Sequence, residues 1–161
     1  MTYLKGETSK PNHCVFCHKV QAEDEPEYVV FRSEHVYATL NLFPYNNGHL
    51  LIVPYTHAPD IEDLSPAVLA DLMRTAREGV IALRAVYHPN AFNIGVNLGA
   101  AAGAGIAEHF HMHVVPRWAG DTNYMTVVGQ TRVIPDLLLD TYRRLREAWP
   151  PRSGNEQGAG T

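Results

Sequence analysis

The chain has no excess of positive charge. It contains 13 Lys and Arg residues against 17 Asp and Glu residues, so its net charge is −4 when histidine is neutral. Proteins that bind nucleic acids broadly usually present a basic surface, because contacts with phosphates supply most of that affinity. We therefore expect no nucleic-acid partner.

Long apolar runs are also lacking. No stretch of the sequence approaches the roughly 20 apolar residues that a membrane-spanning helix needs. The first ten residues have no apolar core of the kind found in a signal peptide. The sequence thus predicts no membrane association and a cytoplasmic location. Its 161 residues and 45% hydrophobic content suit a single domain with its own core.

Cysteine is scarce, and the two cysteines lie together as Cys14 and Cys17. In a reducing compartment such a pair indicates a redox or metal site before a structural disulfide. A thioredoxin-type motif would follow a strand, and no convincing strand precedes this pair. Zinc fits better, but two thiolates supply only half of a tetrahedral site, so histidines must complete it. The candidate histidines are His57, one histidine of residues 109–113, His13 and His18.

Histidine is abundant, and residues 109–113 read His-Phe-His-Met-His. This alternation predicts a strand over 109–115 that places three imidazoles on one face and Phe110, Met112 and Val114 on the other. Neighbouring histidines would then lie roughly 6–7 Å apart, so a single metal ion could not easily bind all three. Because histidine titrates near neutral pH, the row indicates phosphate binding, proton transfer, nucleophilic attack or metal ligation.

The rest of the chain predicts an α+β fold with a mainly antiparallel sheet, since strands and helices mix without regular βαβ alternation. Strands are expected at 27–33 and 35–42, which form a hairpin, and at 49–53 and 91–98. Ser65 and Pro66 begin a helix that ends before Pro89, and a second helix is expected over 135–149. We divide the chain into an N-terminal segment (1–13), one domain (14–149) and a disordered tail (150–161).

Residues 99–105 form a loop of Gly and Ala directly before the histidines. The loop lacks the spacing and the lysine of a P-loop. Its small residues would nevertheless let backbone N–H groups approach an anion closely. The alternative is that the loop is a plain connector.

Several motifs together resemble the histidine triad (HIT) family. Residues 109–115 match its His-φ-His-φ-His-φ-φ signature, with φ apolar, at every position. Residues 14–17 are similar to the N-terminal motif of zinc-containing members, and residues 48–54 with His57 to their central strand and the histidine beyond it. Residues 41–48 and 116–124 are similar to the diadenosine tetraphosphate phosphorylase branch. The resemblance covers residues 14–149.

The resemblance implies a HIT-like fold with a mainly antiparallel five-stranded sheet and two helices. It also implies a homodimer in which the two sheets join into one continuous sheet. A structural zinc ion would be held by Cys14, Cys17, His57 and His109. Such a site has four protein ligands and leaves no open position for a catalytic water molecule.

The same resemblance assigns catalytic roles to His109, His111 and His113, with His109 shared with the zinc site. His111 would be the nucleophile, whose neutral ring nitrogen attacks the α-phosphorus and forms a covalent nucleotidyl-histidine. Its other ring nitrogen should carry hydrogen and donate to a backbone carbonyl. His113 would contact phosphate oxygens. His49 is similar to an additional supporting histidine of the family, and the alternative is a histidine buried in the core.

Further resemblance assigns the substrate contacts. Asn41 matches the ribose-binding position, Asn97 matches a polar position near the α-phosphate, and we add Gly103 and Gly105 of the loop. Trp118 and Tyr124 could stack on a base or pack in a dimer interface. Many family members contact the leaving group with Gln four residues before the first triad histidine, or with Ser three residues before it. This chain has Gly105 and Ile106 there, so backbone N–H groups would have to substitute.

These features predict an enzyme that cleaves dinucleoside polyphosphates, such as diadenosine tetraphosphate, at the α-phosphate. The acceptor would be inorganic phosphate in a phosphorylase or water in a hydrolase, and the sequence favours neither. Two alternatives stay open: a nucleoside phosphoramidate hydrolase, and a nucleotide-binding regulatory protein with little turnover.

Overall fold

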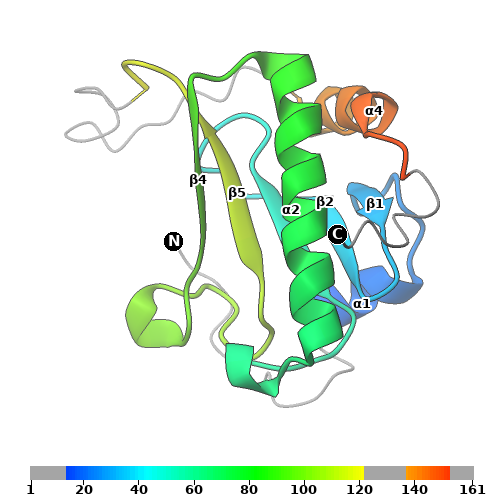
Figure 1. Cartoon of the computed structure of the whole chain (residues 1–161), viewed down its shortest axis with the longest axis vertical. Coiled ribbons are helices and arrows are strands. Elements are labelled where there is room, and N and C mark those ends of the chain that lie inside the picture. Colours follow the sequence, from blue (N-terminus) through cyan, green and yellow to red (C-terminus); the bar gives the residue numbers. More distant parts are fainter. Residues whose placement is uncertain (1–13, 122–136, 153–161) are drawn as a thin grey trace, which may run out of the picture.

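The structure, a computed structural model, describes residues 14–121 and 137–152. Within these residues, five strands form one antiparallel sheet in the order β1-β2-β3-β5-β4 (Figure 1). The strands are β1 (Val29–Arg32), β2 (Val36–Leu40), β3 (Leu50–Pro54), β4 (Ala91–Val96) and β5 (Met112–Arg117). The helices are α1 (Val15–Gln21), α2 (Pro66–Tyr87) and α4 (Leu138–Ala148), with short 3₁₀ turns η2 (Ile61–Asp63) and η3 (Ala100–Ala102).

The α+β prediction with a five-stranded antiparallel sheet is confirmed. Both predicted helices are present, but the described residues contain a third α-helix, α1, that the sequence analysis did not predict. This helix has only seven residues, and no side chain caps it at Cys14. Such a short uncapped helix is stabilised mainly by tertiary packing, here the burial of Phe16.

Helices cover both faces of the sheet. Helices α2 and α4 pack on one face, which α2 crosses in front in Figure 1, and they form the larger core with alternate residues of β2, β3 and β5. On the opposite face α1 packs through Phe16 against Tyr37, Leu51 and Val53. Strands β2 and β3 are therefore buried on both sides. The second face, under α1, carries the cavity described below.

The long helix α2 follows the sequence prediction closely. The Ser65 hydroxyl accepts the Val68 N–H at 3.4 Å, and Pro66 opens the helix. The helix ends at Tyr87, and the C-cap residue His88 adopts a left-handed conformation. At Gly79 an added Cβ would lie 3.1 Å from Leu50 Cδ1, so this glycine lets α2 approach β3 closely.

The turn before β3 depends on one glycine. Gly48 has φ of +73°, a backbone conformation that residues with a side chain rarely adopt. A Cβ added at this position would lie 2.6 Å from Leu83 Cδ2. Glycine therefore allows the turn to pack against α2. The turn delivers His49 to the start of β3.

The predicted triad strand begins later than expected. Strand β5 starts at Met112, and His109 and His111 precede it. The reason is that the Phe110 N–H donates to the Ala58 carbonyl at 2.7 Å, outside the sheet, before the chain joins β3 and β4. The alternation still holds, because Phe110 and Val114 are buried in the larger core while His111 and His113 face the cavity.

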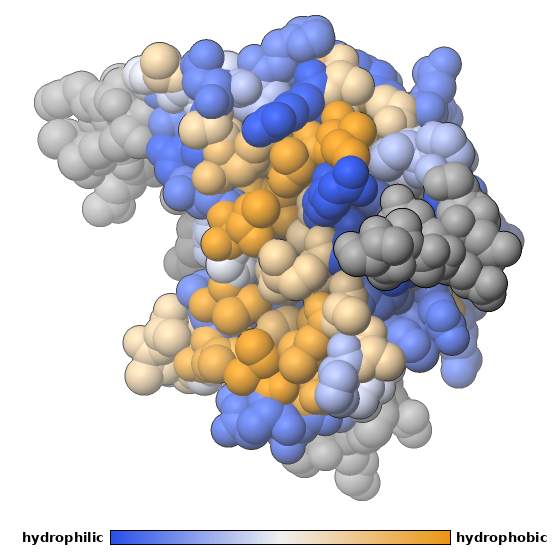
Figure 2. All heavy atoms as spheres, in the orientation of Figure 1, coloured by the Kyte–Doolittle hydropathy of each residue, from blue (hydrophilic) through white to orange (hydrophobic). Residues whose placement is uncertain are grey.

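Strand β4 is the last strand in the sheet order, and most of its residues are exposed. Ile94 on this strand and Leu98 just after it are exposed large apolar residues. Figure 2 shows apolar side chains gathered along β4 and around the loop that follows it. This edge has no strand partner within the described part of the chain.

The chain is described as far as Arg152, whose guanidinium donates to Glu78 at 2.9 Å and to Asp71 at 3.2 Å. The rest of the predicted tail and the predicted N-terminal segment lie outside the described residues, as does Tyr124. Among the described helices, none is long and apolar enough to cross a membrane. The cytoplasmic location stays a prediction.

Candidate active site and metal centre

Four side chains from three parts of the chain meet at the start of α1. They are Cys14, Cys17, His57 and His109, and their ligand atoms all lie within 4.8 Å of one another. His109 Nδ1 lies 3.2 Å from His57 Nδ1, 3.4 Å from Cys14 Sγ and 3.6 Å from Cys17 Sγ. Cys17 Sγ lies 3.3 Å from His57 Nδ1.

These separations fit a tetrahedral zinc site. Zinc with bonds of about 2.0 Å to nitrogen and about 2.3 Å to sulfur would separate two nitrogens by about 3.3 Å, and nitrogen from sulfur by about 3.5 Å. Two thiolates and two imidazoles form a donor set that zinc prefers. These four residues could therefore hold a metal ion. Of the competing ligands, His13 lies outside the described residues, and His18 lies 3.7 Å from the Glu27 carboxylate on the surface.

The ring orientation of His109 also suits a metal ligand. Its Nε2 lies 2.9 Å from the Pro54 carbonyl, which must accept an N–H. The proton is thus placed on Nε2, and Nδ1 keeps its lone pair toward the cysteines. Burial and the neighbouring Cys14 raise the pKa of the Cys17 thiol to about 11. A bound dication would lower that pKa, because it stabilises the thiolate.

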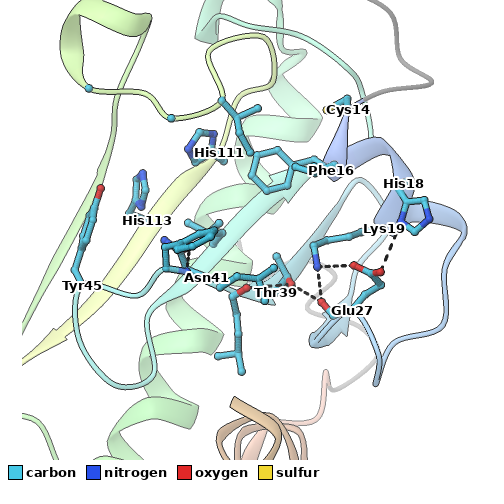
Figure 3. A pocket seen from close by; sticks show the side chains of 18 residues that line it. Cys14, Phe16, His18, Lys19, Glu27, Thr39, Asn41, Tyr45, His111 and His113 are labelled. Atoms are coloured by element: carbon cyan, nitrogen blue, oxygen red, sulfur yellow. Dashed lines mark hydrogen bonds and ion pairs between the residues drawn. The ribbon is translucent and has the colours of Figure 1, made fainter. Parts of the chain in front are cut away.

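A cavity of about 710 Å³ lies on the same face of the sheet. Its walls are formed by helix α1, by the end of β2 with the segment that follows it, by the loop after η3 and by the triad (Figure 3). Most of the lining is apolar, with Phe16, Leu42 and Ile106 among the residues that form it. A mostly apolar cavity with a few converging polar groups is typical of a small-molecule site.

His111 lines this cavity, and a backbone contact determines which of its ring nitrogens carries the hydrogen. Its Nδ1 lies 2.9 Å from the carbonyl oxygen of His109, so Nδ1 carries the hydrogen and Nε2 the lone pair. The predicted backbone acceptor is therefore confirmed. The Phe16 ring lies 5.1 Å from the His111 ring between centroids. Burial lowers the pKa of His111 and favours the neutral ring.

His113 is oriented by His49 and by the backbone of Tyr45. The Tyr45 N–H donates to His49 Nδ1 at 3.0 Å, which places the His49 proton on Nε2. His49 Nε2 then donates to His113 Nδ1 at 2.9 Å. The Tyr45 ring stacks on the His113 ring at 5.8 Å between centroids. His49 is thus buried, as the alternative reading expected, and it also contacts the triad directly.

This chain of hydrogen bonds fixes the proton of His113 as well. Because His113 Nδ1 accepts, its Nε2 carries the hydrogen. That buried atom has no partner among the described residues. Burial lowers the pKa of His113 to about 4. The rings of His111 and His113 lie 5.0 Å apart between centroids, so a lone pair and an N–H donor stand side by side.

The predicted substrate contacts fall into two groups. Asn41, Gly103 and Gly105 line the cavity. Asn97 follows β4 and is not among the described residues that line it. Trp118 does not line it either, and its ring contacts the Tyr87 ring edge-on.

The loop before the triad offers backbone donors. Gly103 has φ of +92°, and its N–H donates to the Ala100 carbonyl at 3.0 Å. Within the described residues, the N–H groups of Gly105 and Ile106 donate to no acceptor. These are the positions at which the sequence analysis expected backbone N–H groups to substitute for a polar side chain.

Three residues of the site were not predicted from the sequence. Lys19 and Glu27 form an ion pair in the cavity wall at 2.9 Å, and Tyr45 supplies both a ring and an N–H to the histidines. Tyr45 follows the predicted ribose-binding Asn41 by four residues, which was a usable signal. Lys19 and Glu27 are ordinary charged residues in the sequence, and only the fold brings them together.

Known proteins are similar to this chain over most of its length. The family model described as HIT domain matches residues 22–120. The protein named AP-4-A phosphorylase from Mycobacterium tuberculosis is 48% identical over 129 residues, which are 80% of this chain and 66% of that relative. The chain therefore spans slightly less than two thirds of that relative's length.

Solved structures show the same fold. A Zn-bound histidine triad family protein from Mycobacterium smegmatis has a TM-score of 0.71 and 32% identity, over 86% of this chain and 94% of that chain. A Plasmodium falciparum diadenosine triphosphate hydrolase has a TM-score of 0.60 and 16% identity, over 76% of this chain and 74% of that chain, and shows the fold alone. With the family model covering more than half of its length, this chain belongs to the HIT domain family.

Proposed function

We propose that the protein cleaves dinucleoside polyphosphates, such as diadenosine tetraphosphate, through a nucleotidyl-His111 intermediate. One observation carries the proposal: the His109 carbonyl accepts the Nδ1 hydrogen of His111, so the lone pair of Nε2 is available at a cavity that also contains His113. The likeness to a protein named AP-4-A phosphorylase supports this substrate class.

In the first step His111 Nε2 attacks the α-phosphorus. A nitrogen–phosphorus bond forms, and the bond from phosphorus to the bridging oxygen of the polyphosphate breaks, so that ATP leaves from diadenosine tetraphosphate. The ring becomes positively charged, and the His109 carbonyl stabilises it through the Nδ1 hydrogen.

Hydrogen-bond donors stabilise the negative charge that develops on the phosphate oxygens in the transition state. His113 supplies its Nε2 hydrogen, whose position is fixed by the bond from His49. The N–H groups of Gly105 and Ile106 supply donors for the leaving polyphosphate in place of the missing side chains. Donors that are oriented before the reaction need no reorganisation in the transition state, which is why they accelerate it.

In the second step an acceptor oxygen attacks the same phosphorus and the nitrogen–phosphorus bond breaks. Inorganic phosphate as acceptor releases ADP, and water releases AMP. Either acceptor loses one proton to solvent or to the leaving histidine. The neutral form of His111 is restored for the next turnover.

The cluster of Cys14, Cys17, His57 and His109 would hold zinc in a structural role. Four protein ligands complete a tetrahedral site, so the ion supplies rigidity rather than an activated water molecule. It would tie α1, which forms one wall of the cavity, to the backbone that orients His111. The chain's own histidines perform the reaction.

We also propose that two copies pair through β4. In the described part of the chain one edge of this strand has no partner strand, and this edge together with the exposed Ile94 supports an interface between sheets. Sedimentation of the protein should give the mass of a dimer, and Ile94→Lys should shift it toward the monomer. A monomeric wild-type protein at micromolar concentration would refute this pairing.

Product analysis on diadenosine tetraphosphate tests the reaction. ADP plus ATP that appear only with added phosphate would establish phosphorolysis, and AMP plus ATP without phosphate would establish hydrolysis. Nucleotide binding without products would favour the regulatory alternative. The absence of both binding and products would refute the proposal, and nucleoside phosphoramidates would then be the next substrates to test.

A further inference from the structure

The cavity has a second polar end, away from the triad histidines. Lys19 of α1, Glu27 before β1 and Thr39 of β2 meet there, whereas His111 and His113 lie together at the other end (Figure 3). The wall between them is mostly apolar. The proposed reaction uses only the histidine end.

Lys19 is an unusual residue for such a wall, because it is only 5% exposed. Its ammonium donates to the Glu27 carbonyl oxygen at 2.5 Å and to Glu27 Oε2 at 2.9 Å. An ammonium group has three hydrogens. The third has no acceptor among the described residues.

Glu27 keeps acceptor capacity beside this donor. The Lys19 bond holds the pKa of the Glu27 carboxyl below its usual range, so the group stays ionised. A carboxylate has about four lone-pair positions, and Lys19 occupies one of them. Its other oxygen, Oε1, lies 3.7 Å from His18 Nδ1 at the surface. A donor and an acceptor thus stand side by side in the cavity wall.

Stability alone does not explain this pair. The Lys19 side chain is buried, whereas the Glu27 side chain keeps 28% of its exposure. Taking the ammonium out of water carries a cost, and a well-packed apolar side chain of similar size often stabilises a protein equally well or better. The pair is also not the only polar contact of this backbone segment, because the Thr39 hydroxyl lies 3.2 Å from the Glu27 carbonyl oxygen and 3.1 Å from the Tyr28 carbonyl oxygen, between which it shares its one hydrogen. A ligand that presents one donor and one acceptor would be complementary to this pair.

A nucleotide seated by its phosphate at His111 would reach this end with its base. Asn41 lines the cavity between the two ends, where the ribose would lie. Phe16 and Leu42 offer apolar contacts for the faces of a base. The edge of adenine carries an amine donor beside a ring-nitrogen acceptor, which complements a carboxylate beside an ammonium.

We propose that Lys19 and Glu27 determine base specificity: Lys19 donates to a ring nitrogen of adenine, and Glu27 accepts from its exocyclic amine. This inference rests on the proposed function, because it needs the α-phosphate at His111. Guanine also carries a donor beside an acceptor, in the reverse order, so it is the competing occupant. Unsubstituted purine has no such donor.

The test is equilibrium binding by calorimetry to the full chain loaded with zinc. Three ligands are compared: AMP, GMP and purine riboside 5′-monophosphate, which lacks the amine. A hydrogen bond to a charged group should make AMP bind at least about tenfold more tightly than the purine analogue. AMP should also bind more tightly than GMP.

The double variant Lys19→Met/Glu27→Leu keeps the size of both side chains and removes both charges. We expect it to bind AMP and the purine analogue within about threefold of each other. The matched control is Arg143→Met/Glu25→Leu, which removes an ion pair of 3.0 Å outside the cavity. The control should keep the wild-type ratio of AMP affinity to purine-analogue affinity, because loss of an ion pair outside the cavity does not change how the base is bound.

Different results overturn different claims. Equal binding of AMP and the purine analogue by the wild-type protein refutes base reading by the pair and leaves the proposed function intact. Tighter binding of GMP than of AMP refutes the adenine assignment. A preserved ratio in the double variant assigns specificity to other residues. Failure of all three nucleotides to bind refutes the proposed function itself.

Discussion

His109 and His113 lie four residues apart in one alternating run, yet the structure uses them differently. His109 faces two cysteines and a second histidine, with four heteroatoms within 4.8 Å. His113 faces His49 and the Tyr45 ring through one hydrogen bond of 2.9 Å and a stacked contact. We call the first group the metal cluster and the second the histidine pair.

The difference lies in what the fold places opposite each ring. At the metal cluster, every ring or sulfur offers a lone pair, which suits a cation. At the histidine pair, each acceptor nitrogen already has a donor. The His113 N–H has no partner among the described residues, which suits an anionic ligand there. His111 stands between them, and its backbone bond to His109 links it to the cluster. The residue type sets the chemistry available, and the neighbours select which part is used.

Replacing His111 should have the largest effect on activity. We expect His111→Ala to lower the rate of diadenosine tetraphosphate cleavage by at least about 10³-fold, because the nucleophile is lost. Zinc content and AMP binding should stay near wild type, which would separate chemistry from the metal cluster. Steady-state kinetics and calorimetry measure these quantities.

The control for this variant is His35→Ala, whose side chain lies near Glu34 on the surface. It should keep wild-type turnover. If His111→Ala retained more than about a tenth of the wild-type rate, the covalent intermediate would be wrong.

Metal removal tests the other region through stability. Chelation should lower the melting temperature by about 10 °C or more, since binding to four ligands is coupled to folding. The double variant Cys14→Ser/Cys17→Ser should melt at the same lowered temperature and should not respond to the chelator. Thermal unfolding with metal analysis measures both, and an unchanged melting temperature after complete zinc loss would remove the structural role of the cluster.

Changing His49 should have a smaller effect on the rate. His49→Leu removes the donor that orients His113, and we expect a loss of about 10–100-fold in turnover. His49→Gln keeps an N–H in that place and should restore part of the rate. Zinc content should not change in either variant. Zinc loss from His49→Leu would show that the two regions are not independent.

The smallest effect concerns pH. The pKa of His113 is about 4 in the folded protein and near 6.5 in an unfolded chain, so the unfolded state binds the proton more readily. The free energy of unfolding should therefore decrease as the pH falls from about 6.5 toward 4, by about 1–2 kcal/mol after allowing for the partial exposure of the ring.

Denaturant titrations of the wild type and of His113→Asn at pH 7 and pH 5 measure this contribution. Both proteins share any loss that comes from the metal cluster, so the difference between them isolates His113. An equal decrease in the two proteins would contradict the prediction.

Local signals in the sequence were sufficient for the long helix α2. The Ser65 cap, the Pro66 start and the apolar stripe of α2 are short-range features, and the structure reproduces them. Helix α1 escaped prediction because it is short and has no capping side chain. It is held by packing of Phe16 against residues far along the chain.

The site shows the same limit. The alternating run predicted which face His111 and His113 share, but not that the strand begins only at Met112. That start depends on the Ala58 carbonyl, which lies more than fifty residues earlier. The ion pair of Lys19 and Glu27 likewise depends on how α1 crosses the sheet. Sequence spacing reports local geometry, and these contacts are set by the whole fold.

Residue His109 contributes to both regions, and this has a practical consequence. Its side chain belongs to the metal cluster and its carbonyl holds the His111 ring, so a small rotation of this residue changes both surroundings together. Cobalt(II) in place of zinc absorbs visible light and is sensitive to ligand geometry. A cobalt-loaded protein would therefore carry a built-in optical reporter, whose colour would register occupation of the neighbouring cavity without any attached label.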